Sequence, residues 1–480
     1  MAKRYLYGAS IQGIQSFIFQ TNKLKDIVGA SEIVNNVCTD LFSNEFLQEG
    51  QLVVSAAGKI LCIYSTQKMV GNALSRFPKR VQEYAPGVTV SQAVVAFDSE
   101  DEKALKNAQS QLEERLRIQR NRPSKSIMLG LMGMERSRTT GLPAIVYEGN
   151  DFVDESTCAK RNVFKQGVTN HLYKKMTGEQ KDFSKAYYDF KELTGNNDWI
   201  AVIHADGNGL GEVVAKQNNA KDLKAFSEKL DQSTIEAARR SCSLLMRDSI
   251  LPIRPVVIGG DDLTVICKAD IAVDFVLIYL KCFEEETRNR GIPLTACAGI
   301  AYMKSSYPFY YGYEMAEMLC GKAKEDAKSD VLKSANNGLA PSCMMFHKIQ
   351  SSFVDDFSVI YEKELHPCQT HSYLFGPYYI SEQKSRWTIT DLINIVEELN
   401  LDVDKNSAKS NIREWLTILS EKGEDACRQK EKRIKECATS QTRKLFQIST
   451  EASDRGDGIK RHPAYDILSL YTIKYQETNR

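Results

Sequence analysis

Two adjacent carboxylates in a glycine turn are the residues of this sequence best suited to chemistry. Asp261 and Asp262 follow Gly259 and Gly260, and runs rich in Val and Ile stand on both sides. Apolar β-forming runs around such a turn predict a hairpin, and glycine lets the backbone turn tightly and approach a ligand. Crowded carboxylates repel one another unless a cation lies between them. Mg²⁺ or Mn²⁺, which prefer oxygen ligands, are the cations that this turn would hold.

Asp206 supplies a further carboxylate at the end of a second apolar run. Gly207, Asn208 and Gly209 follow it and predict a turn into a helix, where backbone N–H groups can hold phosphates. A strand–helix–strand order between Asp206 and the hairpin would bring their carboxylates together. Carboxylates from neighbouring strands beside a phosphate site are what metal-dependent nucleotidyl transfer needs. His204, on the same apolar run, is interpreted as a core histidine and is left out of the site.

The same positions also have structural interpretations that the sequence leaves open. The hairpin carboxylates could belong to a solvent-facing turn. Asp206 could cap a helix, and Asn208 could serve the geometry of the turn.

Length and composition predict a protein of about three or four domains with sizeable cores. The chain has 480 residues, 42% of them hydrophobic, and a net charge of +1, so overall charge would not drive nucleic-acid binding. The 12 cysteines form no Cys-x-x-Cys pair and no His is followed by Asp, which argues against a zinc ribbon and a His-Asp nuclease. Without a signal peptide or a long apolar span, we expect a cytoplasmic protein that does not contact a membrane.

The order of predicted elements repeats along the chain. The first copy has a strand at 4–10, a helix from 32 to about 49, a hairpin at 52–64, a helix near 67–84 and a strand near 88–97. The second copy has a strand at 199–205, a helix to about 246, the hairpin with the two carboxylates, a helix near 270–289 and a strand at 294–301. Ser10 then corresponds to Asp206 and Ala57 to Gly260, which indicates a duplication with a period of about 200 residues. The first copy has Ser-Ala-Ala-Gly-Lys in place of Gly-Gly-Asp-Asp, so we expect it to serve packing or to hold a second substrate.

We therefore predict an α+β protein with two tandem palm domains of the ferredoxin-like, cyclase type and a helical C-terminal domain. The expected boundaries are 1–125 for the degenerate first palm, 126–195 for a connecting region, 196–352 for the second palm and 353–480 for the C-terminal domain. The basic end of the helix expected near 101–122 is interpreted as a solvated face or, alternatively, as a contact to an RNA backbone.

Several motifs taken together resemble the large subunit of type III CRISPR effector complexes. They are Asp206-Gly-Asn-Gly-Leu-Gly211, Gly259-Gly-Asp-Asp262, Ala323-Lys324, Ile11-Gln-Gly-Ile-Gln-Ser-Phe17, Thr21-Asn-Lys-Leu-Lys25 and Gly29-Ala-Ser31. Their conjunction in this order is specific, whereas the hairpin alone would not be. The resemblance extends over residues 5–350 and, by pattern only, over the C-terminal region. The sequence departs from the fuller family pattern because it starts at the first palm, without a His-Asp domain, and lacks the cysteine pairs of a zinc-binding insert.

The resemblance implies a signalling nucleotidyltransferase that is switched on when target RNA pairs with the guide RNA of a complex built with other protein subunits. ATP would be the substrate, Mg²⁺ or Mn²⁺ the cation, and the product a cyclic oligoadenylate or AMP joined to S-adenosylmethionine. Asp206, Asp261 and Asp262 would be the catalytic and metal-binding residues, with Asp262 as a ligand or as an orienting group. Nucleotide binding would involve Gly207, Asn208, Gly209, Gly259, Gly260, Lys324 on the outer phosphates, and Ser31 near the acceptor.

Other interpretations of the motifs remain. Lys324 could be a surface lysine, and Ser31 could start a helix. The whole chain could be a structural or RNA-binding subunit without turnover, a stand-alone defence polymerase, or a diguanylate-type synthase of cyclic dinucleotides.

Overall fold

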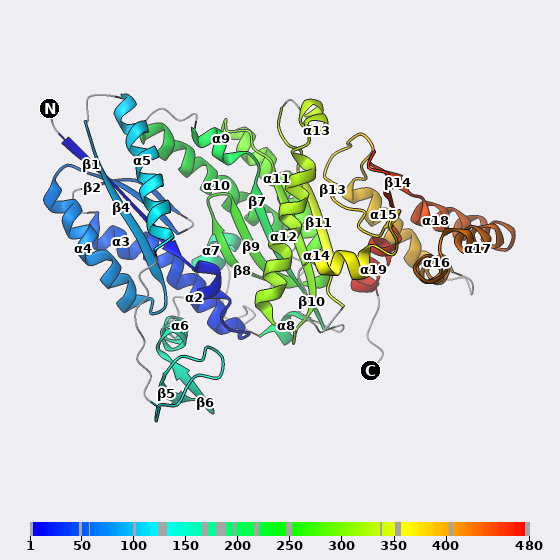
Figure 1. Cartoon of the computed structure of the whole chain (residues 1–480), viewed down its shortest axis with the longest axis horizontal. Coiled ribbons are helices and arrows are strands. Elements are labelled where there is room, and N and C mark those ends of the chain that lie inside the picture. Colours follow the sequence, from blue (N-terminus) through cyan, green and yellow to red (C-terminus); the bar gives the residue numbers. More distant parts are fainter. Residues whose placement is uncertain are drawn as a thin grey trace.

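The computed structural model describes residues 3–47, 50–56, 58–98, 102–122, 132–165, 171–178, 189–194, 198–215, 220–245, 252–336, 338–350, 357–402 and 407–475. It confirms the predicted α+β class: two sheets with packed helices precede a mostly helical C-terminal region (Figure 1). Ala57 lies outside the described residues. Among the described helices, none is long and apolar enough to cross a membrane.

The first sheet is antiparallel and has helices on both faces. Its strands β1 (Lys3–Gln12), β2 (Gly50–Ala56), β3 (Lys59–Tyr64) and β4 (Thr89–Asp98) are arranged in the order β2-β3-β1-β4. Side chains alternate along β1, so Leu6 packs against α5 (Glu102–Arg120), whereas Tyr7 and Ala9 join the larger core on the other face. That face also carries α1 (Ile14–Ile18), α2 (Leu24–Asn36), a π-helical turn (Val37–Leu41), α3 (Phe42–Phe46) and α4 (Gln67–Tyr84).

The second sheet extends the same arrangement by two strands. Its order is β13-β11-β10-β7-β9-β8, with only β10 and β11 parallel among its described pairings. The strands are β7 (Trp199–Gly207), β8 (Ile253–Gly259), β9 (Asp262–Lys268), β10 (Ala296–Lys304), β11 (Cys343–Lys348) and β13 (Tyr378–Tyr379). The helices of this part are α9 (Leu210–Ala215), α10 (Ala220–Leu245), a 3₁₀ turn (Ala269–Ile271), α11 (Ala272–Asn289), α12 (Phe309–Ala327) and α13 (Asp330–Ala335).

The two sheets share one strand order, as a duplication requires. The order β2-β3-β1-β4 in the first corresponds to β8-β9-β7-β10 in the second. Ser10 pairs with Lys59 across β1 and β3, and the register of β7 with β9 sets Asp206 opposite Asp262. The first copy therefore places a hydroxyl and an ammonium group where the second places two carboxylates.

One expected helix begins earlier than its sequence pattern indicated. We expected a helix from residue 32, but α2 begins at Leu24 and a π-helical turn precedes α3. Gly29 argued against a helix over this stretch, because glycine has a low helix propensity. A Cβ at Gly29 would lie 2.2 Å from the carbonyl oxygen of Lys160 on α6 (Glu155–Lys165), so close packing between helices, and not local propensity, requires glycine there.

The connecting and C-terminal regions complete the chain. Besides α6, the connecting region contains β5 (Ala144–Glu148), β6 (Asp151–Asp154), α7 (His171–Thr177) and α8 (Phe190–Thr194). The C-terminal region contains α14 (Phe357–Ile360), a π-helical turn (Tyr361–Leu365), α15 (Ile389–Leu401), α16 (Ala408–Lys422), α17 (Glu424–Cys437), α18 (Ser440–Thr450) and α19 (Ala464–Tyr475). It also holds a small sheet of β12 (His371–Ser372), β15 (Lys460–Arg461) and β14 (Ser453–Asp454), whose strands are too short to show a sequence period. The domain boundaries given above remain a prediction.

Helix α12 lies directly on β10, and Gly299 makes this contact possible. A Cβ at Gly299 would lie 2.0 Å from the carbonyl oxygen of Ala316 and 2.5 Å from the backbone nitrogen of Cys320. We expect Gly299→Ala to destabilise the protein by about 3 kcal/mol, because the whole helix must move away from the sheet. Thermal unfolding would show a clearly lower midpoint. Gly321→Ala on the same helix, where nothing lies within 4 Å of the new Cβ, should leave the midpoint unchanged or slightly higher; equal midpoints for both variants would contradict the packing argument.

Candidate metal and nucleotide site

Two neighbouring strands place the central carboxylates of the site. Ala205 on β7 pairs with Leu263 on β9, so the next residues outward, Asp206 and Asp262, face one another at the end of both strands. Asp206 also pairs with Cys297 on β10, which fixes β7 from its other side. The predicted meeting of the strand end and the hairpin therefore occurs one residue beyond the last cross-strand pair of β7 and β9.

A histidine joins these carboxylates. One potential ligand atom from each of His204, Asp206 and Asp262 lies within 4.8 Å of the others. His204 is two residues before Asp206 on β7, so both side chains project from the same face of the strand. His204 is buried, as expected of a core histidine, but its place beside the two carboxylates was not predicted. The available signal was the His-x-Asp spacing at the end of a strand.

Asp261 takes a different position from its neighbour. A Cβ built on Gly207 would lie 2.9 Å from the Cβ of Asp261 and 3.3 Å from its Oδ2. Gly207 is therefore the residue that lets the hairpin approach the end of β7. Of the two hairpin carboxylates, the structure brings Asp262 into the group with His204, whereas Asp261 lies against the backbone at Gly207.

Burial and mutual repulsion raise the proton affinity of the hairpin carboxylates. Burial, followed by the charges of Asp262 and Asp206, raises the pKa of Asp261 to about 7. Burial and the charge of Asp206 raise the pKa of Asp262 to about 6, against the attraction of Lys324 and Lys59. These ionised groups lack enough compensating positive charge, which a bound cation would supply.

We expect Asp261→Asn to stabilise the metal-free protein at alkaline pH. The unfolded carboxyl ionises near pH 3.8, whereas the folded one holds its proton to about pH 7, so through this group the stability of the folded state falls as pH rises between these values and is lowest above pH 7. The unfolding midpoint of the variant should exceed that of the wild type by about 2 °C or more at pH 8, and the difference should shrink toward pH 4. Asp425→Asn, at a side chain that is 94% exposed, should show no such difference. A variant less stable than the wild type at pH 8 would contradict this account.

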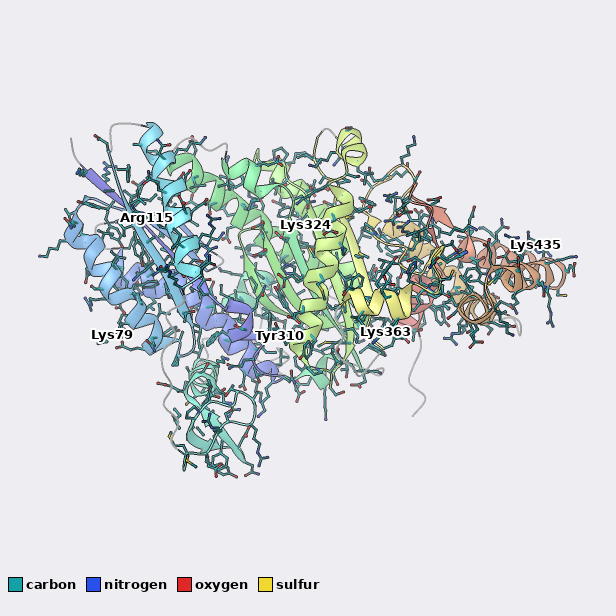
Figure 2. The ribbon with its side chains drawn as sticks, in the orientation of Figure 1. Lys79, Arg115, Tyr310, Lys324, Lys363 and Lys435 are labelled. Carbon is teal, nitrogen blue, oxygen red and sulfur yellow. The ribbon has the colours of Figure 1, made fainter. Side chains whose placement is uncertain are left out.

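Lys324 on α12 (Figure 2) contacts the same site. Its Nζ forms an ion pair with Asp206 Oδ2 and donates a hydrogen bond to the carbonyl oxygen of Gly207 at 2.8 Å. Burial would lower the pKa of Lys324, but the charge of Asp206 and the hydrogen bond to it, with smaller contributions from Cys320 and Cys297, together outweigh burial and the net shift is upward. The side chain is 16% exposed, so Lys324 is a partly buried residue beside Asp206 and the interpretation as a surface lysine is wrong.

The turn after Asp206 is braced by β10. Asn208 donates its backbone N–H to Thr295 O at 2.8 Å, and its Nδ2 donates to Thr295 Oγ1 at 3.0 Å and to Cys297 Sγ at 3.3 Å. Gly209 has a φ of +71°, which L side chains rarely adopt. The short helix α9 follows at once, and the role of this turn in holding phosphates remains a prediction.

The hairpin tip is held by α10. Gly260, with a φ of +63°, donates its N–H to Asp231 Oδ1 at 3.2 Å and accepts a hydrogen bond from Thr234 Oγ1 at 2.6 Å. Gly259 pairs with Asp262 and closes the two-residue turn. The hairpin thus has a fixed place relative to both sheet and helix.

A cavity of about 510 Å³ lies between the two palms and is within the size range of small-molecule sites. His204 and Asp262 line it from the second palm, and Ser31 and Ser55 from the first.

Ser31 lies inside α2 and donates its hydroxyl to Ile27 O at 2.9 Å, so the proposal that it starts a helix is wrong. The positive charge of Lys59, on the first hairpin, lowers the pKa of Asp262. Lys59 was not predicted as a site residue, and the only sequence feature that pointed to it was its place in the degenerate Ser-Ala-Ala-Gly-Lys motif.

The residue set fits a divalent cation. It offers two carboxylates and an imidazole within 4.8 Å of one another, and like charges raise the pKa values of the hairpin carboxyls. Carboxylate oxygens are suitable ligands for Mg²⁺ and Mn²⁺, and an imidazole nitrogen is a suitable further ligand for first-row transition ions.

Comparison with known proteins relates the second palm to a family. A family model described as the second palm domain of Cas10/Cmr2 matches residues 199–333, so this part of the chain is similar to that domain. Among solved structures, the chain has the fold of the Csm1 subunit. The match to a Csm1–Csm4 cassette in complex with cA4 has a TM-score of 0.63 at 13% identity and covers 100% of this chain and 70% of the other. Matches to the cassette with AMPPNP and to the Csm1–Csm4 subcomplex of the type III-A CRISPR–Csm interference complex each have a TM-score of 0.55 at 14% identity, with the same two coverages. No curated protein sequence matches.

Proposed function

We propose that this chain, with its similarity to a Cas10/Cmr2 second palm, is the nucleotidyltransferase subunit of a type III CRISPR effector complex. It would make a signalling nucleotide from ATP when target RNA pairs with the guide RNA held by the complex. The observation that carries the proposal is the group formed by Asp206, Asp262 and His204 on neighbouring strands, of which Asp262 and His204 line the cavity between the two palms. The Csm1–Csm4 structures with AMPPNP and cA4 support the substrate class by analogy of fold.

The reaction is an attack by an acceptor nucleophile on the α-phosphate of ATP: a ribose hydroxyl where the acceptor is ATP, and a different group where it is S-adenosylmethionine. With the hydroxyl, the new P–O bond forms as the hydroxyl proton passes to water, the bond from that phosphorus to the oxygen bridging to the β-phosphate breaks, and pyrophosphate leaves with the electron pair. A divalent cation, when bound, supplies Lewis acidity at the phosphate and favours the ionised acceptor. Asp206 and Asp262, with Asp261 beside them, would hold Mg²⁺ or Mn²⁺.

The remaining site residues bind and orient. Lys324 already contacts Asp206 and is close enough to the strand end to pair with triphosphate oxygens. Gly207 and Gly209 keep the turn free of side chains, so that the backbone can approach a phosphate. Ser31 and Lys59 stand on the first palm's side and would face the acceptor.

Product analysis tests the proposal. The full chain, alone and in its complex with guide and target RNA, is incubated with Mg²⁺ or Mn²⁺ and ATP, with and without S-adenosylmethionine, and products are resolved by mass. Cyclic oligoadenylates from ATP alone, or a mass equal to AMP plus S-adenosylmethionine that requires both, would support it and identify the acceptor. A cyclic guanine dinucleotide from GTP would favour the diguanylate-type enzyme. No product with ATP and metal demonstrably bound would favour a structural subunit.

A further inference from the structure

His204 is a buried imidazole in direct reach of the two paired carboxylates. Its side chain belongs to a residue that is 9% exposed, and one of its ring nitrogens lies within 4.8 Å of carboxylate oxygens of both Asp206 and Asp262. It also lines the cavity between the palms. An imidazole in this place adds a nitrogen donor to a site that is otherwise built from oxygen.

Three residues hold this ring in place. Nδ1 lies 3.1 Å from Thr264 Oγ1, the residue directly across from His204 in the register of β7 and β9. The ring of Tyr313 packs edge-on against the imidazole, with 5.7 Å between ring centroids. Tyr313 in turn accepts a hydrogen bond at 2.8 Å from Nε2 of Gln15, which belongs to the N-terminal motif Ile11–Phe17. Hydrogen bonding at one ring nitrogen fixes the tautomer and leaves the other nitrogen free to bind a cation.

A neutral imidazole keeps one lone pair. With the proton on Nδ1, where Thr264 Oγ1 can accept it, that lone pair is on Nε2.

We propose that His204 is a nitrogen ligand of the cation held by Asp206 and Asp262, and that it makes this site prefer Mn²⁺ over Mg²⁺. The inference deepens the proposed function, on which it rests for the use of a cation. Mg²⁺ demands oxygen ligands and gives up water reluctantly, whereas first-row transition ions accept imidazole nitrogen readily. The N-terminal motif then has a role at the reaction centre, because Gln15 supports Tyr313 and Tyr313 supports the ligand.

A competing arrangement uses the same atoms without a metal–nitrogen bond. In it, Thr264 donates to Nδ1 and the protonated Nε2 donates to a carboxylate, so His204 only positions Asp206 or Asp262. Removing the ring would then affect binding of Mg²⁺ and Mn²⁺ alike.

Pulsed electron paramagnetic resonance of bound Mn²⁺ separates the two arrangements. The full chain is titrated with Mn²⁺, and the spectrum of the bound ion is examined for modulation from a coordinated ¹⁴N nucleus. The proteins compared are the wild type, His204→Gln and Asp262→Asn. The matched control is His366→Gln, at a histidine of the C-terminal region. We expect strong ¹⁴N modulation in the wild type and in His366→Gln, and its loss in His204→Gln. The Kd for Mn²⁺ should rise about tenfold in His204→Gln, while the Kd for Mg²⁺, measured by competition, should change much less.

The outcomes are distinct. Mn²⁺ binding that depends on Asp262 but shows no ¹⁴N modulation, or modulation that persists in His204→Gln, overturns the inference and leaves the proposed function standing. An equal loss of Mn²⁺ and Mg²⁺ affinity in His204→Gln also overturns it, in favour of the positioning role. Absence of any Mn²⁺ binding that depends on Asp262 overturns both the inference and the metal site of the proposed function.

Discussion

Replacing Asp262 with Asn is expected to lower nucleotidyl transfer about 1,000-fold while the protein stays folded. Asn keeps the size of the side chain but removes the charge that faces Asp206 across β7 and β9. The loss of several kcal/mol of charge stabilisation at the transition state corresponds to a fall of this order. The rate is measured as pyrophosphate released from ATP by the activated complex.

The same substitution should not lower the stability of the metal-free protein. The pKa of Asp262 is raised to about 6 by burial and the charge of Asp206, so the neutral amide removes a repulsion and the unfolding midpoint of the metal-free protein should not fall. Asp425→Asn, at an exposed side chain of α17, should retain full activity. Retention of more than about a tenth of the activity by Asp262→Asn would show that Asp262 is not a metal ligand in turnover.

Replacing Lys324 with Met is expected to reduce turnover about 100-fold without weakening Mn²⁺ binding. The ammonium group pairs with Asp206 and also donates to Gly207 O, so it competes with a cation for the same carboxylate. Removing it frees Asp206 for the metal but removes a positive charge that would stabilise the triphosphate in the transition state. Methionine retains an unbranched stem of similar length, which limits the change in packing.

Steady-state kinetics and Mn²⁺ titration together check this prediction. Lys322→Met on the same helix is the matched control, because its side chain is 52% exposed and pairs only with Glu325 among the ion pairs described. The control should behave as the wild type. If Lys324→Met lost Mn²⁺ affinity together with activity, the lysine would be needed to build the metal site and would have no separate role at the phosphates.

The fold class and the duplication could be predicted from the sequence because they depend on local patterns. Apolar runs with glycine turns indicated both hairpins, and the recurrence of strand, helix, hairpin, helix and strand gave two copies that share one strand order. Helix α2 could not be placed in this way. A glycine such as Gly29 indicates a break in a helix. Only the close contact between its backbone and the backbone of Lys160 on α6 explains why glycine stands inside a helix here.

Within the site, the residue types and the elements that carry them follow from the local sequence: Asp206 stands at a strand end, Asp261 and Asp262 in a hairpin, and Lys324 on a helix. Which of these residues meet depends on how the strands pair. The register between β7 and β9 brings Asp262 and His204 to within ligand distance of Asp206, whereas Asp261 acts on Asp206 from its place beside Gly207. Register is a relation between segments far apart in the chain, and because side chains alternate along a strand, a shift of one residue would have turned the opposite set toward the cavity.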